Sequence, residues 1–316
     1  MLLTEAIKEL IIATRSAGRS VRTVEAYQRH LQYLSGYLGD RDISEITGSD
    51  LRRYAASLQD RTERYVGHPT STVRPGGLAR DSVISYLRAV KRLFNWLASE
   101  NMIVENPARG LRLPRSAERA PKAYDINDFV KLLIATQGNT PVRIRDRALL
   151  LLLADTGCRV GGLTQLQLSD LDMGKNTVRL REKGERYRVV PFSDATSDAL
   201  LLWLDVRPQV SEDWVFINLG PIVREVRLTE DAVGEVLRRL KRRAKVKGRV
   251  NPHSFRHGFA REWLRAGGDL ATLARMLGHA DPSITLRFYA CFQADELHDF
   301  HARFSPVVRL YGEGAE

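Results

Sequence analysis

The spacing of apolar residues predicts that the first part of the chain is helical. Residues 21–38 and 81–100 each place an apolar side chain every three or four positions, the period of an amphipathic helix. We expect Asp81 to cap the second helix, because its carboxylate can accept a hydrogen bond from the first turn. The polar segment 60–79 predicts a long loop. The repeating apolar positions are Val24, Tyr27, Leu31, Leu34, Ile84, Leu87, Val90, Phe94 and Leu97.

The second half of the chain mixes helical and strand patterns. Residues 125–136 have a helical period and open on an aspartate cap, whereas 145–157 are apolar nearly all round and end on glycine, which predicts a buried helix. Apolar and polar residues alternate over 177–190 on both sides of a turn at Lys183, which predicts a β-hairpin. From about residue 197 the pattern is mostly helical.

Prolines and basic residues at 112–122 interrupt the helical period and predict a domain boundary. We therefore expect a helical domain at 1–113, a linker at 114–122 and a second domain at 123–316. The predicted fold class is mainly α with a small antiparallel β-sheet. With 316 residues and 43% hydrophobic content, the chain can bury a core in each domain.

The composition adds a strong positive charge, with a formal net value of +11 and basic residues in every segment. Such a surface attracts phosphate-rich polymers, and the alternative is a merely soluble basic surface. The longest apolar run, 148–154, is too short to span a membrane, and acidic residues near the N-terminus do not fit a signal peptide. We expect a cytoplasmic protein without a membrane partner, in which Cys158 and Cys291 are reduced.

Three side chains of the predicted helix at 252–264 carry candidate chemistry. His253, Arg256 and His257 share one face, because they lie three and four positions apart. Two histidines at this spacing can bind zinc, but no carboxylate or cysteine matches them and Arg256 would repel a metal ion. The face therefore suits an anion. The aromatic residues expected to pack on the other face are Phe255, Phe259 and Trp263.

Four more residues, outside this helix, could act together with its His253, Arg256 and His257. Arg159 follows the buried helix, Lys183 lies in the hairpin turn, His279 follows a helix that stops at a glycine, and Tyr289 lies shortly beyond. Taken singly, the arginine and the lysine would be solvated surface residues and the tyrosine a core residue. Taken together, they suit attack of a phenol oxygen on a phosphodiester: arginines bind the charged oxygens, a lysine protonates the leaving oxygen and imidazole accepts the phenol proton. This reaction requires no metal or other cofactor.

Four stretches of the sequence closely resemble, in order and separation, the motif boxes of the tyrosine recombinase (phage integrase) family. They are DTGCRVGGLTQLQLSDLD, EKGERYRVVPF, HSFRHGFA and LGHADPSITLRFY. The resemblance covers nearly the whole chain, roughly from Leu3 to Phe304. It implies a helical core-binding domain and an α+β catalytic domain that form a C-shaped clamp.

The resemblance also implies roles for individual residues. The two arginines would clamp the scissile phosphate, the lysine would be the general acid, the first histidine a base or proton relay, and the last histidine a hydrogen-bond donor to the phosphate. The tyrosine would form a 3′-phosphotyrosyl bond that conserves the phosphodiester energy, so rejoining needs no ATP. The implied catalytic residues are Arg159, Lys183, His253, Arg256, His279 and the nucleophile Tyr289, with His257 in support.

Two positions depart from the family pattern. Gly161 and Gly162 stand where members usually carry a small residue followed by an acid, so another acid must support the active-site helix or the activity is lower. Tyr289 lies ten residues after His279, and the residue at nine, Phe288, has no hydroxyl. The nucleophile can only be Tyr289.

The resemblance implies a site-specific recombinase of the Xer-like or transposon type, which acts as a tetramer on double-stranded DNA with inverted-repeat half-sites. The core-binding domain begins almost at Met1, which leaves no room for an arm-binding domain and favours this subgroup. One alternative is a DNA-binding protein of the same fold that has lost cleavage, which the Gly162 departure favours; a type IB topoisomerase fits the spacing less well. The amphipathic segment 292–304 would pack on its own domain or dock on a neighbouring protomer.

Overall fold

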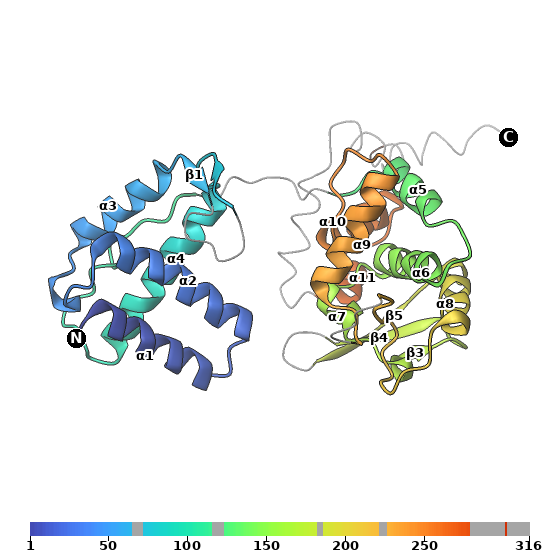
Figure 1. Cartoon of the computed structure of the whole chain (residues 1–316), viewed down its shortest axis with the longest axis horizontal. Coiled ribbons are helices and arrows are strands. Elements are labelled where there is room, and N and C mark those ends of the chain that lie inside the picture. Colours follow the sequence, from blue (N-terminus) through green and yellow to red (C-terminus); the bar gives the residue numbers. More distant parts are fainter. Residues whose placement is uncertain (65–71, 116–122, 182–185, 221–225, 279–300, 302–316) are drawn as a thin grey trace. The chain divides into compact units, whose positions relative to one another are not determined.

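The structure is a computed structural model that describes residues 1–64, 72–115, 123–181, 186–220, 226–278 and 301. The chain divides into two compact units, Met1–Glu118 and Arg119–Glu316 (Figure 1). Helices predominate, and the described strands form two small antiparallel sheets. The predicted fold class, mainly α with a small antiparallel sheet, is confirmed. No helix among the described residues is long and apolar enough to cross a membrane.

The first unit packs its helices around an aliphatic and aromatic core. The predicted stripes of both helices face this core: Leu31 and Leu34 of one, and Leu87 and Phe94 of the other, are fully buried. Burial of these side chains away from water is the main force that holds such helices together. The elements are α1 (Leu3–Ser16), α2 (Val21–Leu38), η1 (Ile43–Glu45), α3 (Gly48–Gln59), β1 (Glu63–Arg64), β2 (Arg74–Pro75) and α4 (Arg80–Ser99).

The prediction that Asp81 caps α4 is wrong. The cap is Ala79, whose carbonyl accepts hydrogen bonds from the backbone N–H groups of Ser82 and Val83. Asp81 lies inside the first turn, where its negative charge interacts favourably with the positive end of the helix dipole. The predicted long loop also contains a two-residue antiparallel ladder, because β1 pairs with β2.

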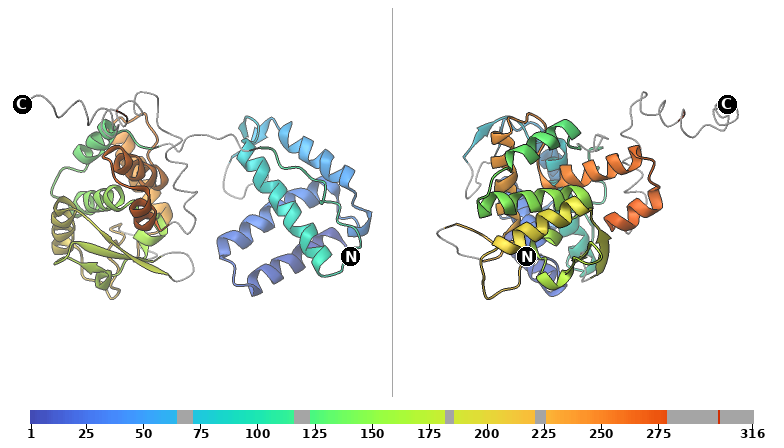
Figure 2. Two further views of the ribbon diagram at one scale, coloured as in Figure 1. Left: turned by 180° about the vertical axis from the view of Figure 1, so that it is seen from behind. Right: turned by 90° about the vertical axis from the view of Figure 1, so that its right-hand side faces the viewer.

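The second unit places a three-stranded antiparallel sheet, in the order β3-β4-β5, at one end and α5 at the other, with α6 between them (Figure 2). The predicted hairpin is confirmed: β4 pairs with β5, and Val178 lies opposite Val190. The elements are α5 (Ile126–Ala135), α6 (Pro141–Thr156), α7 (Val160–Thr164), η2 (Leu168–Asp170), β3 (Leu171–Asp172), β4 (Thr177–Arg181), β5 (Tyr187–Pro191), α8 (Asp194–Val206), α9 (Glu230–Arg243), α10 (Pro252–Arg265) and α11 (Leu270–Leu277).

Helix α6 forms the centre of this unit. Leu149, Leu150 and Leu153 are fully buried, and α6 packs against both α8 and α10, as expected for a helix that is apolar nearly all round. It ends at Gly157, which adopts a left-handed conformation with φ of 57°. A Cβ at Gly157 would lie 2.8 Å from the Phe259 ring, so both the backbone angle and the packing require glycine.

The mostly helical pattern expected after residue 197 is interrupted. Between α8 and α9 the described residues are not helical, and isolated antiparallel bridges join Trp214 to Gln167 and Ile217 to Arg227. These pairings add a short extended segment beside α6. The segment is stabilised by contacts distant in the sequence, which a local hydrophobic period does not reveal.

A buried ionic network joins three elements of the second unit. Arg145 and Asp146, both on α6, are 4% and 2% exposed, and the Arg145 guanidinium donates to Asp146 Oδ1 at 2.8 Å and to the Ile217 carbonyl at 3.0 Å. Arg239 of α9 donates to Asp146 Oδ2. Asp146 thus neutralises a buried cation and ties α9 to α6.

We expect Asp146→Ala to destabilise the second unit by about 3 kcal/mol, because it leaves the buried Arg145 charge without its counter-ion. The thermal midpoint should fall by roughly 6–12 °C, measured by circular dichroism. Glu235→Ala is the matched control, because Glu235 forms an exposed pair with Arg238 and its loss should change stability by about 0.5 kcal/mol or less. Equal shifts for the two variants would contradict the role given to Asp146.

Candidate active site

The structure describes four of the seven residues that the sequence singled out. His253, Arg256 and His257 lie on α10, and Arg159 is the cap residue at the start of α7. Lys183, His279 and Tyr289 lie outside the described residues, so their roles remain predictions.

Arg256 is buried, at 5% exposed, and is held by two helix ends. Its Nη1 donates to the Gly157 carbonyl at 2.9 Å, and its Nη2 donates to the Leu277 carbonyl at 2.6 Å. These carbonyls belong to the C-terminal ends of α6 and α11, where backbone acceptors lack helical partners and the helix dipole is negative. The cation is thereby fixed in orientation without a carboxylate.

The charge of Arg256 persists in this environment. Burial lowers its pKa to about 9, and the positive charges of Arg159 and Arg188 add to this lowering. The guanidinium therefore remains cationic at pH 7. A guanidinium also carries more N–H donors than the two carbonyls use, which suits it to bind an anion.

Arg159 lies near Arg256, in the turn between α6 and α7. It lies two residues after Gly157, the glycine whose carbonyl anchors Arg256, and its side chain is exposed. Leu163 of α7 is buried in the core and fixes the turn. The turn therefore links the exposed Arg159 to the anchor of the buried Arg256.

The helix that carries Arg256 is pressed closely against its neighbours. Phe255 is buried, and its ring lies 5.1 Å from that of Tyr124. A Cβ at Gly258 would lie 2.2 Å from the Tyr124 ring, so only glycine allows this approach. The aromatic face of α10 predicted from the sequence thus sets its rotation, and this rotation turns Arg256 toward Gly157.

The two histidines of α10 differ in environment. His253 is exposed in the first turn, within the capping box that Asn251 and Ser254 form. His257 is half-buried, and burial, together with the charges of His253 and Arg256, lowers its pKa to about 4. His257 is therefore neutral at pH 7, so it can exchange hydrogen bonds near the arginines without adding charge.

The two glycines that depart from the family pattern lie at the start of α7. A Cβ at Gly161 would lie 3.0 Å from Oε1 of Glu230, the first residue of α9. A Cβ at Gly162 would instead face the Arg181 carbonyl of β4 at 3.4 Å. A carboxylate from α9 thus approaches the space that a side chain at 161 would take.

Arg188 of β5 is a residue that the sequence reasoning missed. Burial lowers its pKa to about 10; the charge of Arg159 adds to this lowering, and Cys158 opposes it. The alternation along β5 could have revealed it, because Val190, two residues further on, is fully buried and residues two apart on a strand share a face.

No metal-binding cluster accompanies these cations among the described residues. In the part of the chain that the structure describes, no three His, Cys, Asp or Glu side chains gather as they would around a metal ion. Cys158, next to Arg159, is buried, and burial raises the pKa of its thiol. The described site is an assembly of guanidinium and imidazole groups.

The first unit carries a basic and aromatic cleft of about 490 Å³. Arg61 lies over the Tyr33 ring, 4.7 Å from its centroid, and Arg64 Nε donates to the Gly77 carbonyl at 2.8 Å. Cationic side chains beside aromatic rings are typical of nucleic-acid-binding surfaces. The lining residues are Arg29, His30, Tyr33, Arg61, Arg64, Leu78, Ala79, Ser82, Ser85 and Tyr86.

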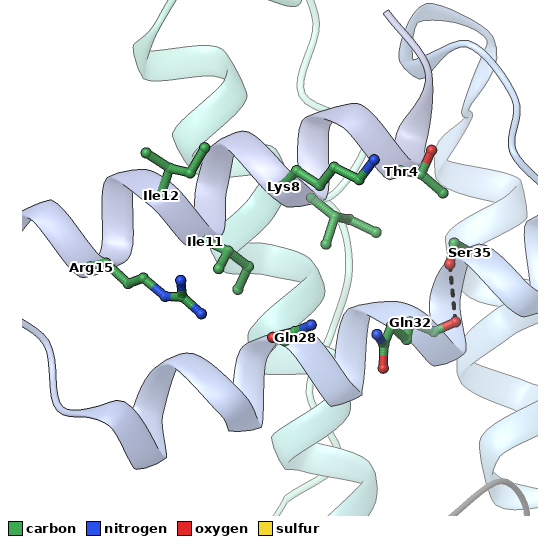
Figure 3. A pocket seen from close by; sticks show the side chains of 9 residues that line it. Thr4, Lys8, Ile11, Ile12, Arg15, Gln28, Gln32 and Ser35 are labelled. Atoms are coloured by element: carbon green, nitrogen blue, oxygen red, sulfur yellow. Dashed lines mark hydrogen bonds between the residues drawn. The ribbon is translucent and has the colours of Figure 1, made fainter.

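A second cleft of about 410 Å³ lies between α1 and α2 and has a different character (Figure 3). Its lining includes the aliphatic side chains of Ile7, Ile11 and Ile12, with Lys8 and Arg15 beside them. Among the described residues, the second cleft has two cationic side chains and no aromatic ring in its lining, whereas the first has three arginines and two tyrosines. The basic and aromatic cleft is therefore the better candidate for contact with a nucleic acid.

Comparison with known proteins shows the family of the chain. Residues 125–295 match the phage integrase family, and residues 9–101 match the phage integrase N-terminal SAM-like domain. Tyrosine recombinase XerD of Listeria monocytogenes is 27% identical over 299 residues, which cover 92% of this chain and 94% of XerD. Tyrosine recombinase XerC of Alcanivorax borkumensis is 32% identical over 272 residues, which cover 84% of this chain and 82% of XerC.

A solved structure shares the fold. The post-cleavage complex of the XerH site-specific recombinase with a palindromic difH substrate superposes with a TM-score of 0.71, at 20% identity, and covers 94% of this chain and 83% of XerH. The family match spans more than half of the chain and includes the arginines and histidines of α10 and the α6–α7 turn. The chain therefore belongs to the phage integrase family and is a tyrosine recombinase.

Proposed function

We propose that this recombinase cuts and rejoins double-stranded DNA at specific sites through a covalent 3′-phosphotyrosyl intermediate. The observation that carries the proposal is the buried guanidinium of Arg256, fixed by the Gly157 and Leu277 carbonyls beside Arg159. A cation that is buried and oriented by dipoles rather than by an acid is prepared for an anionic ligand. The scissile phosphate of DNA is the anion that the family membership suggests.

The reaction follows from these groups. The phenol oxygen of Tyr289 bonds to phosphorus, and the bond from phosphorus to the 5′ oxygen breaks. Lys183 gives the leaving oxygen its proton, and His253 takes or relays the phenol proton. Arg159 and Arg256, together with His279, bind the non-bridging oxygens as their negative charge grows. The reverse attack by a 5′ hydroxyl restores the diester without ATP, metal or other cofactor.

Glu230 is our candidate for the acid that the Gly162 position lacks. Its carboxylate approaches Gly161 in the first turn of α7, where negative charge is favourable. Because Arg159 caps this same helix, support of α7 by Glu230 would steady the arginine. The reaction then does not depend on an acid at position 162.

We further propose that the DNA substrate has inverted-repeat half-sites and that four protomers assemble on two paired sites in the cytoplasm. XerH, which shares the fold, is bound to a palindromic difH substrate in its post-cleavage complex, and this supports a symmetric site for our chain by analogy. In the first unit, the basic and aromatic cleft would contact the DNA backbone through Arg29, Arg61 and Arg64. The segment after Tyr289 would dock on a neighbouring protomer.

A second candidate function is specific DNA binding without cleavage. It is favoured by Gly161 and Gly162, because the usual acid is absent from the first motif. In that case Arg256 and the basic cleft would hold DNA, but no phosphotyrosyl bond would form. The experiment below separates the two functions.

Covalent trapping on a nicked duplex tests the proposal. Binding sites selected from random duplexes by the full-length protein supply the target. A nick close to the cleavage position lets the short fragment that carries the free 5′ hydroxyl diffuse away, which prevents rejoining. We expect an adduct that resists SDS and that mass spectrometry maps to the peptide containing Tyr289. Specific binding without any adduct would refute the cleavage function and support the binding function.

A further inference from the structure

Arg188 places a charge where the fold would normally place an apolar side chain. On β5 it shares a face with Val190, which is fully buried, and it lies opposite Leu180, which is 1% exposed. The nitrogen atoms of its guanidinium are shielded from solvent. Burial of a cation is costly, so a position of this kind calls for a functional explanation.

Arg188 and the two motif arginines occupy one corner of the second unit. Strand β5 packs against α11, and Arg256 is anchored on Leu277 at the end of α11. The charge of Arg159 lowers the pKa of Arg188, and the charge of Arg188 lowers the pKa of Arg256. Three elements, β5, α10 and the α6–α7 turn, thus bring three guanidinium groups within electrostatic reach of one another.

The positive charges of the three guanidinium groups repel one another, and a bound anion relieves this repulsion. A phosphodiester carries one negative charge, whereas the five-coordinate phosphorus formed during attack carries more. A nearby buried cation therefore stabilises the transition state more than the bound substrate. Its removal should slow cleavage more than it weakens DNA binding.

We propose that Arg188 is a positioning residue for cleavage, the third guanidinium of an anion-binding cluster, which acts through Arg159 and Arg256 to favour charge build-up on the scissile phosphate. The proposal rests on the proposed cleavage function. Within it, Arg188 does not need to touch the DNA, because its charge acts through space on the site that the other two arginines form. Loss of the charge should therefore matter more than loss of the shape.

The test compares Arg188→Gln, which removes the charge, with Arg188→Lys, which keeps it. On the nicked duplex we expect adduct formation by Arg188→Gln to be roughly 10- to 100-fold slower than by wild type, with DNA affinity within about twofold because the footprint spans many phosphates. Arg188→Lys should recover much of the rate. Arg186→Gln, a change of an exposed arginine directly before β5, is the matched control and should leave the rate unchanged.

A second readout separates an anion cluster from a structural arginine. Inorganic sulfate, added at constant ionic strength, should raise the melting temperature of the wild type by mass action on the cluster. The shift should be smaller for Arg188→Gln and nearly kept for Arg188→Lys. A wild-type rate for Arg188→Gln would overturn the proposal. An equal loss of rate and melting temperature in both variants, with the sulfate shift intact, would also overturn it. If the wild type forms no adduct, the cleavage function fails, while the sulfate shifts still test the cluster.

Discussion

Tyr289→Phe is expected to abolish the covalent adduct on a nicked duplex while leaving DNA binding intact. The substitution removes one oxygen, the proposed nucleophile, and keeps the aromatic ring. Tyr289 is the one tyrosine among the residues that we assign to the site, so the loss should be complete rather than partial. Gel electrophoresis in SDS measures the adduct, and a mobility-shift assay measures binding.

The neighbouring Phe288 provides a sharp control for this result. In the double variant Phe288→Tyr with Tyr289→Phe the phenol is moved by one residue along the chain. We expect no adduct from it, because the phenol is then attached to a different residue from the proposed nucleophile. Tyr187→Phe, a change of an exposed tyrosine on β5, should behave as wild type. An adduct with Tyr289→Phe would show that the nucleophile lies elsewhere.

Arg256→Ala should lower the rate of adduct formation by roughly 100- to 1,000-fold. The reason is that Arg256 is fixed by the Gly157 and Leu277 carbonyls, so in the proposed reaction its remaining donors would meet the scissile phosphate without reorganisation. DNA affinity should fall only a few-fold, because binding is spread over many phosphates whereas the transition state depends on this one. Single-turnover trapping and titration with labelled duplex measure the two quantities.

Two further variants distinguish a catalytic role of Arg256 from a role in folding. Arg256→Lys keeps the charge but cannot span both carbonyls with a planar fork, so it should remain strongly impaired. Arg265→Ala changes an exposed arginine on the same helix, paired with Glu262, and should have little effect. A parallel loss of affinity, rate and melting temperature in Arg256→Ala would assign the residue to the fold instead of the reaction.

Local sequence was sufficient for those features that depend on neighbouring residues. The apolar run of α6, its stop at Gly157 and the β4–β5 hairpin all follow from periodicity and from the conformational freedom of glycine. The face of α10 that carries Arg256 was also predictable, because residues three and four apart meet on a helix. The cap of α4 was not, because a backbone carbonyl at Ala79 serves where a side chain was expected.

Long-range packing supplied the rest of the candidate site. Arg256 donates a hydrogen bond to the Gly157 carbonyl, 99 residues away in the sequence. A local sequence pattern does not predict a hydrogen bond to such a distant backbone atom. Glu230 approaches Gly161 only because α9 packs on α7. The alternation along β5 could have marked Arg188 as inward-facing, but its place near the other arginines depends on the packing of β5 against α11. Residue types and spacing thus predicted which chemistry the chain carries, whereas the supports of that chemistry depend on contacts between distant elements, which only the folded chain creates.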